Sequence, residues 1–146
     1  PRTLLYFTVW VAIGLGMLTV LSLRKTLAIS VLHDRNPLYV ELKDGTIRNG
    51  YDIKISNMTP APRQVTLHLD GLDKAGLSVA DGEGAPVEAM TIGLEPDKVT
   101  PLRLYVQMSP DALHGATTDF RIVIDSEDGR LHAQSTTQFQ APEAHK

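Results

Sequence analysis

The chain has 146 residues, a formal net charge of -3, a pI near 5.9 and no cysteine. Its mildly acidic balance argues against a general nucleic-acid-binding surface. Without cysteine, this sequence can hold no disulfide, thiol nucleophile, cysteine-ligated zinc or cysteine-ligated iron–sulfur cluster.

The first predicted element is a helix in the uncharged, mostly apolar run from Thr3 to Leu23, which lies between Arg2 and Arg24. A helix needs roughly 20 residues to cross the hydrocarbon core of a bilayer, so this run is long enough to span. The sequence therefore predicts one transmembrane helix. Because the chain begins at Pro1 rather than Met, we expect it to be the last part of a longer polypeptide.

Two other interpretations of the apolar run were weighed. A signal peptide has a shorter hydrophobic stretch and a small-x-small cleavage site, and 21–25 is a poor one. A buried core helix would show a polar stripe, and none is visible. Ala12 and Gly16 form a small-xxx-small pair, which either receives another helix or is merely tolerated in a membrane helix.

The rest of the chain, about 120 residues, suits a single domain and is rich in period-two alternation. Asp44-Gly45 and Asp128-Gly129 are typical turn signals between such runs. The pattern predicts an all-β, immunoglobulin-like antiparallel β-sandwich. We expect the transmembrane helix with its flanks at 1–25, the sandwich at 26–141 and a tail at 142–146. Alternating runs occur at 38–42, 51–55, 65–69, 77–79, 90–92, 102–108, 120–124 and 131–139.

The densest group of functional side chains is His33-Asp34-Arg35-Asn36. His and Asp together can relay a proton, so the group could form a site. It could also be a polar turn before Pro37, with Asp and Asn bonding nearby backbone groups, and we favour the turn. Elsewhere, Asn57-Met58-Thr59 matches a glycosylation sequon, a pattern that is common by chance.

Histidine and methionine side chains could in principle bind copper, which accepts imidazole and thioether ligands. None of them forms a His-x-His, Met-x-x-Met or His-x-x-x-His group. Met90 and Met108 are in phase with core residues, and His68 is predicted to face solvent. The residues therefore predict no catalytic, cofactor-binding or metal site in this sequence. The candidates weighed were His33, His68, His114, His132, His145, Met58, Met90 and Met108.

Two segments carry a resemblance to a known family. They read VLHDRNPLYV at 31–40 and DGTIRNGYDIKISNMT at 44–59. They resemble "VLHDRNP" and "DGxIRNGYxxKIxNMT" in the C-terminal region of the FixG/CcoG-type cytochrome c oxidase accessory proteins. In that family a last membrane helix precedes these motifs and an immunoglobulin-like domain closes the chain. The resemblance extends over essentially the whole sequence, but only 31–59 is diagnostic.

The resemblance implies a context that the residues alone do not. Family members are bacterial inner-membrane proteins with two [4Fe–4S] clusters upstream, and they assist cbb-type oxidase assembly. A cupric-reductase role, with copper as substrate, has been assigned to them. The resemblance therefore implies a periplasmic β domain with no cofactor of its own. Its expected partners are the membrane, other transmembrane helices of the same protein, and oxidase subunits or assembly factors, with no nucleic acid.

Two functions remain open for this segment. In the first, it is a non-enzymatic anchor and interaction domain of the membrane iron–sulfur accessory protein. In the second, it is a copper-receiving domain in the periplasm, built from His and Met side chains that folding brings together. The sequence upstream of Pro1 would identify the family at once if it held ferredoxin-type cysteine repeats.

Overall fold

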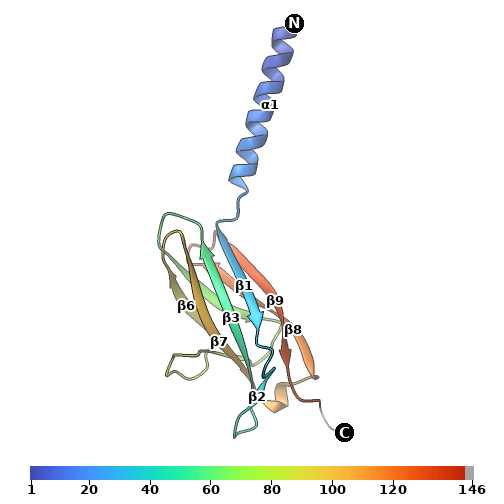
Figure 1. Cartoon of the computed structure of the whole chain (residues 1–146), viewed down its shortest axis with the longest axis vertical. Coiled ribbons are helices and arrows are strands. Elements are labelled where there is room, and N and C mark those ends of the chain that lie inside the picture. Colours follow the sequence, from blue (N-terminus) through green and yellow to red (C-terminus); the bar gives the residue numbers. More distant parts are fainter. Residues whose placement is uncertain (144–146) are drawn as a thin grey trace.

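The computed structural model describes residues 1–143 and has one long helix ahead of a two-layer β-sandwich (Figure 1). Helix α1 spans Arg2–Ser22, and none of its residues is buried. Among the described residues it is the one helix long and apolar enough to cross a membrane, judged by length and composition. Its bounds agree with the apolar run predicted to be helical.

Within residues 1–143, nine strands follow the helix and form two antiparallel sheets. The first sheet has the order β1-β3-β7-β5, with β2 also paired to β3, and the second has the order β6-β4-β8-β9. This arrangement confirms the predicted immunoglobulin-like sandwich. The strands are β1 (Leu27–His33), β2 (Val40–Glu41), β3 (Ile47–Asn57), β4 (Arg63–Asp70), β5 (Gly76–Val79), β6 (Ala89–Leu94), β7 (Lys98–Met108), β8 (Thr117–Ser126) and β9 (His132–Gln140).

Strand β3 lies at the centre of the first sheet and shows why the sequence folds this way. Its alternate residues from Ile47 to Asn57 are buried, as period-two alternation in a half-buried strand requires. The ring of Tyr51 meets the ring of Phe120 from β8 edge to face, with their centroids 5.7 Å apart. This contact joins the two sheets through the core.

The edge of β3 differs from expectation. The sequence predicted a strand at 38–42, but β2 has only two residues, and β1 (Leu27–His33) was not predicted. Both strands pair with the same side of β3. Residues 34–39 connect them and leave the sheet between β1 and β2, and we call this connection the excursion. β1 was not predicted because Ala28 and Leu32, on its outer face, are apolar. The strand therefore lacks a clear alternation of apolar and polar residues.

The two ends of the sandwich differ in their relation to the helix (Figure 1). We call the end that α1 enters the near end; its loops are 58–62, 95–97 and 127–131. The opposite end, with 34–39, 42–46 and 109–116, is the far end. The predicted Asp128-Gly129 turn joins β8 to β9 at the near end, and Gly129 has the positive φ of 69° that such a turn favours.

Candidate functional site

His33 is the last residue of β1 rather than part of a turn. Its ring stacks on Tyr51, with the centroids 4.7 Å apart and the planes 20° apart. Its Nε2 atom lies 3.1 Å from the backbone oxygen of Leu38. These contacts occupy the ring and one ring nitrogen, so His33 holds the excursion 34–39 against the sheet.

Asp34 takes part in an ion cluster on the outer face of the first sheet. Arg103 Nη2 donates to Asp34 Oδ2 over 2.6 Å, and Arg103 Nη1 donates to Asp52 Oδ1 over 3.3 Å. The prediction that the Asp34 side chain bonds nearby backbone is therefore wrong, because it pairs with β7 instead. His33 and Asp34 engage different partners, and no contact among the described residues joins them into a proton relay.

Asn49 and Tyr51 fasten β3 to the end of β9 across the core. The Asn49 side chain donates to the Gln140 oxygen and accepts from the Gln140 N–H, both over 2.8 Å. The Tyr51 hydroxyl donates to the Gln138 oxygen over 2.7 Å. Sequence reasoning missed Asn49, although a polar residue in phase with Tyr51 on a buried strand face is a signal for such a bond.

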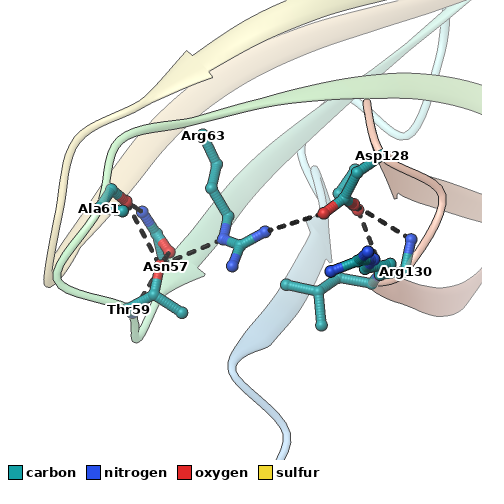
Figure 2. A network of polar contacts seen from close by, with 8 residues as sticks. Asn57, Thr59, Ala61, Arg63, Asp128 and Arg130 are labelled. Atoms are coloured by element: carbon teal, nitrogen blue, oxygen red, sulfur yellow. Dashed lines mark hydrogen bonds and ion pairs between the residues drawn. The ribbon is translucent and has the colours of Figure 1, made fainter.

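A polar network organises the near end (Figure 2). Asn57 Nδ2 donates to the backbone oxygens of Ala61 and Glu95, and its Oδ1 accepts from the hydroxyl of Thr59 over 2.6 Å. Arg63 Nε donates to the Thr59 hydroxyl over 3.2 Å. The network thus ties together the loops 58–62 and 95–97, each of which crosses from one sheet to the other. It also buries Asn57, which is 1% exposed, so the sequon is not accessible in the folded domain.

Arg63 extends this network to the β8–β9 turn. Its Nη1 lies 3.8 Å from Asp128 Oδ2. The Ser126 hydroxyl, the Arg130 N–H and then the Arg63 charge hold the pKa of Asp128 below its ordinary value. Its carboxylate is thus an acceptor that fixes the turn, which is a structural task rather than proton transfer.

The histidines and methionines weighed as metal ligands are spread over the molecule. Met108 lies in the core, and Met90 is partly buried and packs against the core. Met58 is exposed at the near end. His132 Nδ1 lies 2.6 Å from Asp125 Oδ1, and His68 Nδ1 lies 3.7 Å from Asp125 Oδ2. Within residues 1–143, no group of three or more His, Asp or Glu side chains is placed to hold a metal ion. His145 lies outside the described residues.

The predicted solvent exposure of His68 agrees with its half-exposed side chain on the outer face of β4. Its neighbour Asp125 was not singled out from the sequence, because strand register alone brings β4, β8 and β9 side by side. All buried side-chain nitrogen and oxygen atoms in residues 1–143 have hydrogen-bond partners. The polar clusters thus act as internal fastenings of the sandwich.

The fold and the polar clusters together define the class of protein. It is an immunoglobulin-like sandwich domain that follows one apolar helix in the chain. The sequence pattern of the family described as "IG-like fold at C-terminal of FixG, putative oxidoreductase" matches residues 17–142. The chain belongs to this family, which confirms the resemblance stated above.

Relatives of this chain are known from Rhizobium meliloti and Cereibacter sphaeroides. The chain is 40% identical to the nitrogen fixation protein FixG of Rhizobium meliloti over 146 residues, covering 99% of this chain and 28% of FixG. It is 37% identical to the protein RdxA of Cereibacter sphaeroides, covering 88% of this chain and 27% of RdxA. The chain thus spans about a quarter of the length of the curated relatives it matches.

A crystal structure of a FixG-related protein from Vibrio parahaemolyticus has the same fold. It superposes with a TM-score of 0.64, covers 80% of this chain and 97% of that chain, and is 24% identical in sequence. This likeness supports the architecture of the sandwich.

Proposed function

We propose that this chain is the membrane anchor and interaction domain of a longer FixG-type protein, with helix α1 spanning the bacterial inner membrane and the sandwich in the periplasm. The observation that carries the proposal is the direct connection of α1 to a braced sandwich through residues 23–26 alone. A rigid domain on so short a tether stays beside the membrane, where it can hold a partner.

The partners that suit this role are oxidase subunits or other assembly factors of a cbb-type cytochrome c oxidase. The family resemblance supports this assignment. It also supports two [4Fe–4S] clusters in the part of the longer protein upstream of this chain, and a cupric-reductase activity of that protein with copper as the substrate. This chain would contribute no cysteine-ligated iron–sulfur cluster of its own, because it has no cysteine. Its solvent-facing strand edges and end loops are the surfaces that suit recognition.

Truncation of the longer protein after Lys25 tests the proposal. We expect assembled oxidase to fall while the iron–sulfur signal of the truncated protein and its amount in the membrane stay unchanged. Normal oxidase assembly in the truncated strain would contradict an interaction role. Measuring membrane abundance in the same strain separates loss of a partner contact from loss of the protein.

A copper-receiving domain is the second candidate, and the approach of His68 and His132 to Asp125 is the observation that favours it. Imidazole and carboxylate are suitable ligand types for a divalent metal, although within residues 1–143 these three side chains are not placed to hold one together. The thioether ligands that suit Cu(I) are remote from them, because Met58 is at the near end and Met108 is in the core. We therefore rank this function second.

Titration of the isolated domain with Cu(I) and with Cu(II), each in competition with a chelator, tests the second function. We expect no tight binding. Stoichiometric binding that disappears in a His68→Ala or His132→Ala variant would reverse the ranking. Thr136→Ala, an exposed change on β9 outside this group, is the matched control.

A further inference from the structure

The near end of the sandwich carries an exposed apolar tip. Met58 is 51% exposed, although most methionines of small domains are buried. Residues 60–62 in the same loop are exposed and read Pro-Ala-Pro, and Pro96 in the neighbouring 95–97 loop is exposed as well. We call these five residues the apolar tip. It contrasts with the far-end turn at 42–46, which displays Lys43 and Asp44.

The apolar tip is held in place rather than left to fluctuate. Asn57 donates to the backbone oxygens of Ala61 and Glu95, so one buried amide ties the two loops of the tip together. The Met58 N–H donates to the Thr26 oxygen over 2.8 Å, which fastens the tip to the segment leaving the helix. Figure 1 shows both loops on the side of the sandwich that faces α1.

Chain length then limits how far the tip can lie from the end of the helix. Backbone hydrogen bonds continue the helical turn as far as Arg24, and Thr26 is already bonded to the tip. Residues 23–26, even fully extended, reach at most about 14 Å. A headgroup layer is roughly 5 to 8 Å thick, and α1 at about 1.5 Å per residue matches the hydrocarbon core. The tip therefore lies within reach of the headgroups.

We propose that the apolar tip rests on the membrane surface, with Met58 entering the boundary between headgroups and acyl chains. This inference rests on the proposed function, because it requires α1 to span the bilayer. The lipid surface is the occupant that suits the tip, since the tether limits the distance and the exposed side chains of its five residues are apolar, while Glu95 and Asp97, which flank Pro96, can stay in the polar headgroup layer. Contact at both α1 and the tip would fix the tilt of the sandwich, and with it the faces available to a partner.

Site-specific fluorescence in lipid vesicles tests the inference, since single cysteines can be placed in a chain that has none. An environment-sensitive dye is attached at Met58→Cys, at Ala61→Cys, and at Lys43→Cys on the far end as the control. In vesicles with doxyl-labelled lipids, we expect blue-shifted, quenched emission at 58 and 61. The label at 43 should keep the emission that it has without quencher.

Flotation of the same vesicles distinguishes the two ways in which the inference could fail. If the chain floats with the lipid and the labels at 58 and 61 are quenched no more than the label at 43, the inference is overturned and the anchor stands. If the chain does not float, both the anchor and the inference are overturned.

Discussion

At the scale of single residues, the described chain relies on buried polar side chains that join segments far apart in sequence. Asn49 is fully buried and bonds both backbone groups of Gln140, 91 residues away. Unpaired buried backbone groups cost more than a bond contributes, so the loss of either partner is expensive. The Asn49 amide therefore contributes directly to holding the end of β9 against β3.

Replacing Asn49 with alanine should destabilise the domain by about 2 to 4 kcal/mol, because two backbone groups of the half-buried Gln140 lose their partners. Urea denaturation gives the free energy of unfolding. Thr136→Ala, an exposed change on the same strand, should stay within about 0.5 kcal/mol of the parent. Equal stabilities for the two variants would refute the role given to Asn49.

Tyr51 gives the fold a dependence on alkaline pH. Burial raises the pKa of its phenol far above the ordinary value near 10. The folded chain keeps this proton where the unfolded chain releases it, so the free energy of unfolding should fall above pH 10 by about 1.4 kcal/mol per pH unit. Below the unfolded-state pKa, this group adds no pH dependence.

Tyr51→Phe isolates that effect. At neutral pH the variant should be less stable by about 1 kcal/mol, because the Gln138 oxygen loses its donor. Above pH 10 the gap between parent and variant should close, since the variant has no phenol to titrate there. Urea denaturation of both proteins at a series of pH values measures the gap, and a constant gap would exclude the effect.

At the scale of elements, the pairing of β1 with β3, the glycine at position 50 and the ion pair between Asp34 and Arg103 depend on one another. A Cβ on Gly50 would overlap the Asp34 carboxylate, which Arg103 holds over 2.6 Å. Glycine at this position thus lets the excursion 34–39 return to the sheet. Gly50 and the excursion 34–39 both lie in the segment 31–59 that carries the family resemblance.

Gly50→Ala should cost about 0.5 to 1.5 kcal/mol, because Asp34 must move and its half-exposed pair with Arg103 is lost. Gly93→Ala in β6 is the matched control, since a Cβ there meets nothing within 4 Å. Thermal unfolding compares the two. Adding Asp34→Ala to Gly50→Ala should cost less than it costs in the parent chain, and strict additivity would argue against the overlap.

Helix α1 has an equally direct test. Gly14→Arg should impair membrane insertion, because a central arginine costs roughly 2.5 to 3.5 kcal/mol on the insertion scale. The isolated segment is the right sample, since neighbouring helices could rescue the change in a longer protein. Gly14→Leu should insert normally. Full resistance of the arginine variant to carbonate extraction would weaken the spanning assignment.

Local patterns predicted the helix and most strands, because apolar run length and period-two alternation are visible over a few residues. The alternation at 51–55 and 65–69 corresponds to β3 and β4, whose inward residues are buried. β1 was missed because Leu32 points outward. The pairing of Asp34 with Arg103, 69 residues apart, depends on strand order, which local pattern does not determine.

At the scale of the whole molecule, the central proposal is that α1 anchors the sandwich on the periplasmic side of the membrane. Labelling with a membrane-impermeant maleimide tests it most directly, because the chain has no cysteine of its own. Thr91→Cys, exposed on β6, should be labelled in intact cells, whereas Arg2→Cys should be labelled only after lysis. The cysteine-free chain is the control. Labelling of Thr91→Cys only after lysis would contradict the claim.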